Sequence, residues 1–437
     1  MFRGVILMRW MWRVAAGAAM LGGLVLAGCG GNSDSNDGTA QLRLINASPG
    51  YPSLDLTVDD AKKATAVTTG SASGYASVGV SSISTVITST GSTTALSTTT
   101  RSLTKDVSHT LVAYGWAGAL KTAVIEENVS AADTGKAKLM VLNLAADAGS
   151  VDVYLTGSDE SLDDAVAVAS GVAGGGSYGY TGLSSGTYRL RVTGYGDKTD
   201  LRLDVQGLSL GSTQVATLMI THGVGSGGVL VNALLAPQTG AVVAFSNTLA
   251  RARVVGSVSG NGKVTATLGG TSLLANATSP AIGSYAQVSA GSTVATLVVN
   301  GTAVTVPNPV LSAGGDYTLL VWGDAAAPQL TVITDDNRLP TVTSNAKIRL
   351  IHGVAGMSSA LTLTTDFSAA ASNVAQGTAS AYANVAASSA MRLDVTSPLS
   401  SSALYTLTDA NIVAKGLYTV FVLGDSSSPS AALRKDR

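Results

Sequence analysis

The chain has 437 residues, a formal net charge of −1, 12% charged and 5% aromatic residues, and 50 glycines. No basic stripe is present, which argues against nucleic-acid binding, because such proteins concentrate positive charge on one surface. A single cysteine rules out a disulfide within the chain, so folded domains must be held by apolar packing, and the abundance of Ala, Val, Thr, Ser and Gly favours strands joined by glycine-rich turns.

The N-terminal segment has the organisation of a bacterial signal peptide. Residues 1–13 carry three arginines and no acid, and residues 14–26 form an apolar run rich in Ala, Gly and Leu. That run is short for a membrane-spanning helix but has the length of a signal-peptide core. The residues before the only cysteine resemble a lipobox, which we assign to Leu26, Ala27 and Gly28. We therefore predict that residues 1–28 are a lipoprotein signal peptide and that Cys29 is lipidated.

The lipobox resemblance implies a compartment and a membrane partner. Several acyl chains on Cys29 would anchor the protein stably without a spanning helix. Residues 29–39 then form a flexible tether, because no apolar residue occurs between Gly30 and Thr39. The residue after the cysteine is Gly30 rather than Asp, and in this the chain resembles lipoproteins that are sent on to the outer membrane. We expect a lipid-anchored protein of the bacterial cell envelope, in the outer membrane, with the leaflet left open.

Four short apolar runs introduce four similar stretches of the remaining chain. Residues 41–47 and 138–143 introduce the first two, residues 241–246 a more divergent third, and residues 347–353 the fourth. Each run ends in a polar residue and a turn, which is typical of the first strand of a β-unit.

Two further landmarks repeat with the same period. One is a tyrosine followed three residues later by Val or Leu, and these tyrosines (Tyr75, Tyr180, Tyr285 and Tyr382) lie 105, 105 and 97 residues apart. The other is an apolar run that ends at a glycine (Gly115, Gly223, Gly323 and Gly424). A period of about 100 residues is too long for helical solenoids or propeller blades and fits an immunoglobulin-like sandwich. We predict an all-β chain of four tandem Ig-like antiparallel β-sandwich domains, at residues 40–130, 135–236, 240–339 and 345–437.

Candidate hairpins lie between the tyrosine and the closing run. Residues 188–192 and 201–205 alternate apolar and polar side chains on either side of a turn. Asn300–Gly301 is a strong hairpin signal within residues 296–306. We interpret the threonine-rich residues 81–104 as the same hairpin rather than as a low-complexity linker.

The pattern resembles one known family. Residues 151–154 (VDVY) and 180–188 (YTGLSSGTY), together with residues 43–49 (RLINASP), resemble the DUF4397 family of bacterial exported β-sandwich domains. The resemblance extends over nearly all of the chain after the tether. The third stretch departs from it, with residues 246–248 (SNT) in place of the turn after the opening strand. The resemblance implies a fold and a compartment but no activity.

Two glycine-rich motifs resemble catalytic or cofactor-binding signatures. Residues 175–179 fit G-x-S-x-G around Ser177, and Asp197 and His222 follow in hydrolase order. A nucleophile elbow requires a helix after the serine, whereas a strand is predicted here. Residues 223–228 fit G-x-G-x-x-G, but the dinucleotide version opens a helix, and again a strand follows. We assign no catalytic and no cofactor-binding residues and predict that the chain is not an enzyme.

Histidine spacing gives little support for a metal site. His109, His222 and His352 fall at different landmarks and share no ligand spacing. His352 occupies the position of Asn46 and Asn143, where a hydrogen bond to the following turn is the simpler expectation.

The acidic clusters and repeated tyrosines have ordinary structural interpretations. Residues 159–164 and Asp335–Asp336 could hold Ca²⁺ at a loop or domain junction, but neither matches an EF-hand loop, and a solvated loop is favoured. We assign no metal site. We expect the four tyrosines to anchor cores through ring burial and a hydrogen bond to the backbone, with a stacking platform for sugar as the alternative.

Together these observations favour an envelope lipoprotein with a non-catalytic binding or structural role, in contact with an envelope protein or glycan. Two alternatives remain. A carbohydrate-binding module would expose a strip of aromatic side chains on one sandwich face, and an envelope serine hydrolase would use Ser177. The sequence leaves the partner and the oligomeric state open.

Overall fold

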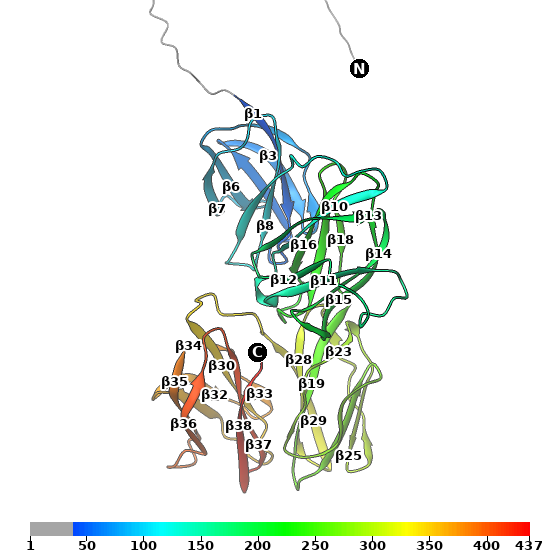
Figure 1. Ribbon diagram of the computed structural model, residues 1–437. Coiled ribbons are helices and arrows are strands. Elements are labelled where there is room, and N and C mark those ends of the chain that lie inside the picture. Colours follow the sequence, from blue (N-terminus) through cyan, green and yellow to red (C-terminus); the bar gives the residue numbers. More distant parts are fainter. Residues whose placement is uncertain (1–37) are drawn as a thin grey trace, which may run out of the picture. The chain divides into compact units, whose positions relative to one another are not determined.

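The computed structural model describes residues 38–437. The predicted signal peptide, its lipobox, Cys29 and most of the predicted tether lie outside the described residues. Regular structure within residues 38–437 is β-strand, apart from one short 3₁₀ helix, η1 (Ala146–Ala148) (Figure 1). No helix in this part of the chain is long and apolar enough to cross a membrane. The predicted fold class, all-β with tandem β-sandwiches, is confirmed.

The first sandwich is built from β1 (Thr39–Asn46), β2 (Ser53–Val58), β3 (Ala61–Thr68), β4 (Ser71–Ala72), β5 (Ala76–Gly79), β6 (Ile83–Ser89), β7 (Ala95–Arg101), β8 (Ser108–Tyr114) and β9 (Lys121–Glu126). Its first sheet has the order β4-β1-β8-β9, with β5 also paired to β1, and its second sheet has the order β3-β2-β6-β7. Both sheets contribute to one apolar core, which includes the fully buried Leu44, Leu54 and Leu111. Burial of a leucine side chain contributes about 1.5–3 kcal/mol.

The second sandwich is built from β10 (Lys136–Asn143), β11 (Val151–Thr156), β12 (Ala169–Val172), β13 (Ser177–Ser184), β14 (Gly186–Gly194), β15 (Asp197–Leu210), β16 (Val215–His222), β17 (Val231–Pro237) and β18 (Val243–Phe245). The first sheet has the order β13-β10-β16-β17-β18 and the second β12-β11-β14-β15. These strands enclose a separate core that includes Val153, Leu190 and Leu218.

The third sandwich is built from β19 (Leu249–Val258), β20 (Lys263–Leu268), β21 (Thr271–Thr278), β22 (Ala281–Ile282), β23 (Ala286–Ser289), β24 (Gly291–Ser292), β25 (Ala295–Val299), β26 (Thr302–Val304), β27 (Val310–Leu311), β28 (Asp316–Asp324) and β29 (Ala327–Asp335). The first sheet has the order β22-β19-β28-β29, with β23 also on β19, and the second β21-β20-β25-β26. Strands β24 and β27 form a small two-stranded sheet.

The fourth sandwich is built from β30 (Asn345–His352), β31 (Leu361–Thr365), β32 (Ser368–Val374), β33 (Thr378–Ala379), β34 (Ala383–Ala386), β35 (Ser388–Thr396), β36 (Tyr405–Ile412), β37 (Leu417–Asp425) and β38 (Ser428–Lys435). The first sheet has the order β33-β30-β37-β38, with β34 also on β30, and the second β32-β31-β35-β36. The third and fourth sandwiches each enclose a core of their own.

The opening strand of the third sandwich differs from the prediction. Residues 241–246 were expected to open it, but β18 within this segment pairs with β17 and so extends the first sheet of the second sandwich. The opening strand is β19, whose sequence LARARVVGSV is less apolar than the segment before it. Arg253 of β19 belongs to the site described below, so hydrophobicity alone selected the wrong segment.

A parallel strand pair lies at the centre of every first sheet. The opening strand pairs in parallel with a late strand, β1 with β8, β10 with β16, β19 with β28 and β30 with β37. All other ladders within the named sheets are antiparallel. The connection between the two partners runs through the whole second sheet, so no tight turn fixes their relative direction, and no local pattern in the sequence indicates a parallel pair.

The predicted hairpins are present. Strands β14 and β15 pair across a turn that contains Gly196, and β25 and β26 pair across Asn300 and Gly301, both with positive φ as a type I′ turn requires. The threonine-rich segment forms β6 and β7, which confirms that it is a hairpin.

Candidate functional site

The outer face of each parallel pair packs against a neighbouring sandwich, and we call it the pairing face. On β1, Leu42 and Leu44 point into the core of their own sandwich, so Arg43 and Ile45 lie on the opposite face. Ile45 and its ladder partner Val112 pack against the second sandwich. At the same ladder positions the other three sandwiches have the pairs Leu142–Met219, Val255–Leu320 and Ile351–Phe421.

Two joints result from this packing. One apolar cluster joins the first and second sandwiches, and a second joins the third and fourth through Val255, Leu320, Ile351 and Phe421. Because the same register positions meet in both clusters, the sandwiches associate in two equivalent pairs. We call these the first–second joint and the third–fourth joint.

A buried polar quartet borders each half of the third–fourth joint. In the fourth sandwich, Arg349 Nε donates to Thr419 Oγ1 (3.0 Å), and the Thr419 hydroxyl donates to Asp436. Tyr382 Oη donates to the same carboxylate (3.0 Å), and the Arg349 guanidinium lies 4.6 Å from the centre of the Tyr382 ring. The quartet therefore consists of an arginine on the opening strand, a threonine opposite it, a tyrosine and an acid.

The third sandwich repeats the quartet at the same register. Arg253 Nε donates to Thr318 Oγ1 (2.9 Å), and Thr318 and Tyr285 each donate to Asp335 Oδ2 (2.6 Å). The Arg253 guanidinium lies 4.5 Å from the centre of the Tyr285 ring. The Arg253 side chain remains charged although it is almost completely buried.

The two quartets exchange their ion pairs across the joint. Arg253 Nη1 of the third sandwich lies 2.6 Å from Asp436 Oδ1 of the fourth, and Arg349 Nη1 of the fourth lies 2.7 Å from Asp335 Oδ1 of the third. The exposed fraction of these side chains is 5% or less. Each sandwich thus supplies one arginine and one acid, but each buried arginine has its direct ion-pair partner in the other sandwich.

The first–second joint keeps only half of this arrangement. Arg43 Nε donates to Thr110 (2.7 Å), and Arg43 Nη2 pairs with Glu127 of its own sandwich (2.6 Å) and reaches the carbonyl of Pro237 across the joint (2.9 Å). Tyr75 donates to the same Glu127 carboxylate.

In the second sandwich, the registered position of the arginine is Met140, opposite Thr217, and the residue in the place of the acid is Gln238. No reciprocal ion pair is possible there, so the first–second joint relies on apolar packing and one arginine.

Electrostatics keep the third–fourth quartets in one protonation state. Burial raises the pKa of Tyr285 and of Tyr382 well above the usual tyrosine value. Burial alone would lower the pKa of Arg349, but the charge of Asp335 raises it above its usual value. The tyrosines therefore remain hydrogen-bond donors and the arginine remains charged at neutral pH. Nη2 of Arg253 and of Arg349 is buried without a hydrogen bond, and so is Oδ1 of Asp335; the contact between Arg349 and Asp335 therefore stabilises the joint through charge rather than through a hydrogen bond.

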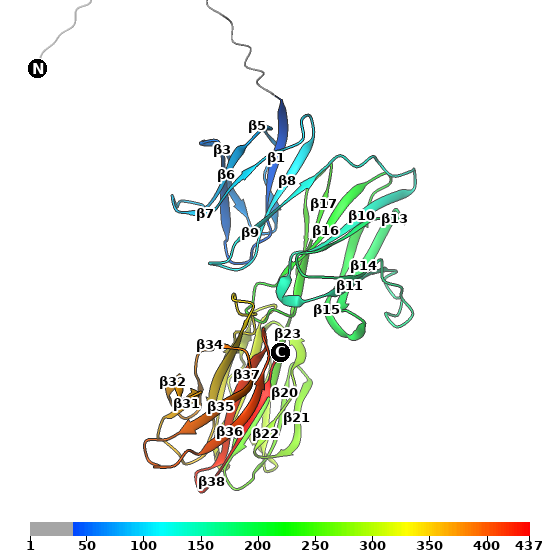
Figure 2. The same cartoon turned by 60° about the vertical axis from the view of Figure 1, so that its left-hand side comes forward.

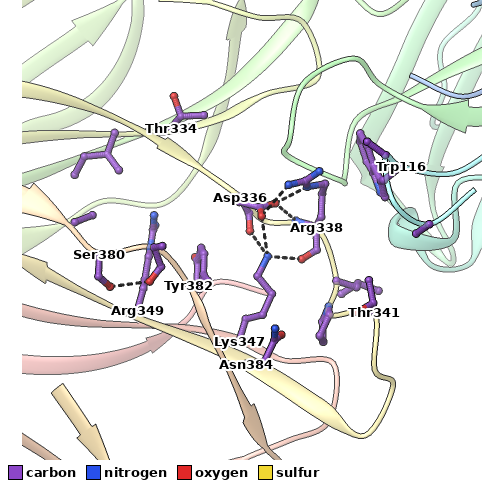
Figure 3. A pocket seen from close by; sticks show the side chains of 17 residues that line it. Trp116, Thr334, Asp336, Arg338, Thr341, Lys347, Arg349, Ser380, Tyr382 and Asn384 are labelled. Atoms are coloured by element: carbon purple, nitrogen blue, oxygen red, sulfur yellow. Dashed lines mark hydrogen bonds and ion pairs between the residues drawn. The ribbon is translucent and has the colours of Figure 1, made fainter. Parts of the chain in front are cut away.

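A cleft of about 460 Å³ lies beside the third–fourth joint, lined by the segment 336–341, by β30 and by Trp116 (Figure 3). Lys347 points from β30 toward Asp336 and Arg338. Its Nζ donates to the carbonyls of Asp336 (2.7 Å) and Arg338 (2.9 Å) and lies 3.2 Å from the Asp336 carboxylate. All three protons of the ammonium are engaged, so Lys347 fixes the linker between the sandwiches and is not free to act as a nucleophile.

The G-x-G-x-x-G segment connects the second sandwich to the third. It forms the predicted turn between β16 and β17, and there Gly225 N donates to Ala313 O (2.9 Å) and Gly227 N to Gly314 O (3.1 Å). A Cβ atom on Gly225 would lie 2.3 Å from the backbone nitrogen of Gly315. The glycines are required because two backbones approach closely, as in a phosphate loop, but the neighbour is protein.

His222 lies in a separate buried group, with Trp116 and Asp147, near the first–second joint. Its ring centre lies 4.6 Å from that of Trp116, whose Nε1 donates to Asp147 Oδ2 (2.6 Å). His222 Nε2 lies 3.9 Å from the same oxygen and makes no hydrogen bond. Burial lowers the pKa of His222 to about 4, against the opposing charge of Asp147. The imidazole is therefore neutral at pH 7.

The residues of the hydrolase-like motif do not form a triad. Ser177 begins β13, so a strand follows it, as predicted. Asp197 accepts hydrogen bonds from Thr199, and His222 lies beside Asp147. No hydrogen bond or ion pair joins these three residues, all of which lie in the described part of the chain.

Other predicted site residues have structural partners. The His352 ring accepts from Val354 N and bonds to Ser359 O, which confirms the expected link to the turn, and the amides of Asn46 and Asn143 make equivalent bonds. Asp335 is buried in the joint rather than in a solvated loop. Within residues 38–437, no group of three or more His, Cys, Asp or Glu could hold a metal ion.

The expectation for the repeated tyrosines is partly wrong. Tyr75, Tyr285 and Tyr382 donate to carboxylates rather than to the backbone. The reason is that each lies across from the arginine of the opening strand, where an acid must also be present. The signal that could have shown this was the arginine itself, which recurs between apolar neighbours at Arg43, Arg253 and Arg349.

Comparison with known proteins identifies one family and several distantly similar solved structures. Residues 40–154 and 250–359 match the family model described as a domain of unknown function, DUF4397. The two matches begin at registered residues of β1 and β19, which agrees with β19 as an opening strand. No curated protein matches the chain.

Among solved structures, a Parabacteroides distasonis protein provisionally described as a cell adhesion protein is 10% identical, covers 70% of this chain and 99% of its own, and has a TM-score of 0.18. The Bacillus anthracis TIE protein is 8% identical, covers 89% of this chain and 69% of its own, and has a TM-score of 0.14. At such TM-scores neither similarity bears on function.

Proposed function

The chain belongs to the DUF4397 family, and on this premise we propose that it is a non-catalytic structural and binding module of the bacterial cell envelope. In this proposal residues 1–28 are removed, Cys29 carries the lipid that anchors the protein in the outer membrane, and the sandwiches present their surfaces to an envelope protein or glycan.

The third–fourth joint is the observation that supports this proposal most directly. Active sites place ionisable groups with perturbed pKa values in a cleft, where they meet substrate. Here the buried arginines, acids and tyrosines bind one another across two sandwiches, and Lys347 at the cleft is engaged by the linker. The ionisable side chains thus hold sandwiches in place, which is the property of a scaffold.

The exposed aromatic residues give no support for the carbohydrate-binding alternative. Such a module needs several aromatic rings along one face, whereas the large exposed aromatic side chains of residues 38–437 are scattered over three sandwiches (Tyr75, Tyr178, Tyr195 and Phe367). In the second sandwich, Tyr178 lies on β13 of the first sheet and Tyr195 at the turn between β14 and β15 of the second.

The anchor is tested by fractionation of cells that produce the full chain or the Cys29→Ser variant. The parent is expected in the outer-membrane fraction with a lipid-modified N-terminus, and the variant is expected to lose the lipid and the shift in mass. Recovery of unmodified Cys29 in the mature protein would refute the anchor.

The binding role is tested by crosslinking in the native envelope, followed by purification of the lipidated protein. Reproducible recovery of one protein or glycan, lost when the envelope is solubilised before crosslinking, is expected. Turnover of an ester, peptide or glycoside substrate that disappears in Ser177→Ala would instead establish the hydrolase alternative.

A further inference from the structure

A tryptophan fills part of the third–fourth joint. The ring of Trp322, on β28 of the third sandwich, packs against Gly377 of the fourth, and a Cβ atom added to Gly377 would lie 2.2 Å from that ring. The indole Nε1 donates to Thr331 Oγ1 on the adjacent strand β29 (3.0 Å). Only glycine fits at position 377, because the indole already occupies the space beside it.

The first–second joint has different side chains at the same ladder positions. Counted from the joint pairs given above, Thr221 of β16 stands at the position of Trp322, and Leu234 of β17 stands at the position of Thr331. Strands β16 and β17 lie side by side in the second sandwich (Figure 2). The first–second joint therefore lacks both the indole ring and the hydroxyl group that accepts its hydrogen bond.

The glycine that the ring would cover is nevertheless retained. Gly70 of the first sandwich is the equivalent of Gly377, because its N–H donates to the carbonyl of Asn46 as that of Gly377 donates to the carbonyl of His352 (2.7 Å each). The atom nearest to a Cβ on Gly70 would be Cβ of Ala244 at 3.6 Å, which is an ordinary contact distance. Space thus remains beside Gly70, whereas the indole fills it beside Gly377.

A cavity of about 270 Å³ lies between the first and second sandwiches at this place. Gly70, Thr221 and Leu234 all line it. Protein interiors contain few voids larger than a water molecule, and an apolar cavity of about 150 Å³ suffices to bind benzene. The cavity is therefore large enough for a molecule with two fused rings.

The walls of the cavity favour an uncharged ligand. Ala47 and Phe245 contribute apolar surface, and Thr221, His222 and Asn232 contribute polar atoms. None of the Asp, Glu, Lys and Arg residues between positions 38 and 437 lines the cavity, and the His222 imidazole is neutral at pH 7. A charged ligand would lose its hydration here without gaining a counter-ion.

We propose that this cavity binds an uncharged aromatic molecule of about the size of indole. The ring lies against Gly70, as the Trp322 ring lies against Gly377. A polar atom of the ligand hydrogen-bonds to Thr221 or Asn232. The third–fourth joint supports this ligand, because it holds the same ring as a side chain at the same ladder position. The site lies between two sandwiches and is separate from the surfaces proposed above to contact an envelope protein or glycan.

Indole itself is the probe, because it is the side chain of Trp322 as a free molecule. Calorimetric titration of residues 30–437, which contain all four sandwiches, is expected to show one site with a dissociation constant on the order of 0.1 mM. 1-Heptanol, a flexible chain without a ring, is expected to bind roughly fivefold more weakly, because binding must restrict its internal rotations.

Two variants fill the cavity from different strands. Thr221→Trp places on β16 the side chain that Trp322 supplies in the other joint, and Ala244→Leu adds a branched side chain beside Gly70 from β18. Circular dichroism establishes that each variant is folded, and either one then suffices for the test. Each is expected to weaken indole binding by roughly tenfold or more, because the ligand loses its space.

The matched reverse change is Trp322→Thr, which removes the ring that covers Gly377 in the third–fourth joint. This variant is expected to bind two molecules of indole, one in each joint. Four results would overturn the proposal: no binding of indole by the parent chain, undiminished binding by a folded cavity-filling variant, a single site in Trp322→Thr, or equally tight binding of 1-heptanol.

Discussion

Replacement of Arg349 by methionine tests whether the exchanged ion pairs hold the third and fourth sandwiches together. The second sandwich already has Met140 at the registered position, so the side chain fits this place in the fold. In Arg349→Met the strand remains apolar, but Asp335 of the neighbouring sandwich loses its counter-ion.

The expected magnitude follows from burial. Arg349 is 2% exposed and Asp335 is fully buried, so the carboxylate would be left uncompensated in a region of low dielectric. Removal of one partner of a buried pair destabilises a protein by about 3–5 kcal/mol, whereas replacement of both partners is often nearly neutral. The double variant Arg349→Met/Asp335→Asn keeps an acceptor for Thr318 and Tyr285. We therefore expect it to recover about 2–3 kcal/mol relative to the sum of the single variants.

Trp322 provides a local reporter of this joint. It packs against the apolar cluster of the third–fourth joint, and Trp116 is the only other tryptophan after residue 37. Urea unfolding of residues 30–437 in a Trp116→Phe background, followed by Trp322 fluorescence, gives the free energy of unfolding for each variant of the cycle. Arg392→Met serves as the control, because its pair with Asp394 is partly exposed, and a small change is expected.

Two outcomes would refute this reasoning. One is a free energy of unfolding for Arg349→Met close to that of the Arg392→Met control. The other is strict additivity of the two joint substitutions, which would mean that Arg349 and Asp335 do not interact across the joint.

Three further predictions concern other parts of the chain. Burial lowers the pKa of His222 from 6.5 to about 4, so the unfolded chain binds a proton at a higher pH than the folded chain does. The free energy of unfolding should therefore fall by up to about 3 kcal/mol as the pH drops from 6.5 to 4. Urea titrations should show a smaller fall in His222→Phe. Gly225→Val should open the contact between the second and third sandwiches and increase cleavage of the following linker in limited proteolysis, whereas Gly179→Ala, with free space around it, should not. Asn143→Ala should cost about 2 kcal/mol in thermal unfolding because the carbonyls of Gly149 and Val172 lose their donor, whereas His352→Asn should cost less than about 1 kcal/mol.

The parts of the fold that depend on short-range pattern could be predicted from the sequence. The hairpin at Asn300–Gly301 follows from the backbone needs of a two-residue turn, and the β14–β15 hairpin follows from alternation of side chains. The period of about 100 residues was readable because each sandwich needs one opening strand and one tyrosine opposite it. The anchor at Cys29 remains a prediction.

The joints could not be predicted in the same way, for two physical reasons. The segment 241–246 is more apolar than β19, so a search for hydrophobic runs missed the third arginine strand and obscured the recurrence of Arg43. In addition, Asp335 and Asp436 lie near the ends of edge strands, where acids are usually solvated. Their burial depends on a second sandwich about 100 residues away, and no local pattern encodes that contact.

The exchange of acids between the last two sandwiches has a consequence for how such chains can grow or be shortened. A sandwich cut out alone would keep Arg253 or Arg349 but leave the carboxylate that pairs with it directly on the discarded fragment. Gene duplication, truncation and engineered fusion should therefore succeed in steps of two sandwiches and fail in steps of one. The matches at residues 40–154 and 250–359, which begin 210 residues apart, have the spacing that such doubling would leave.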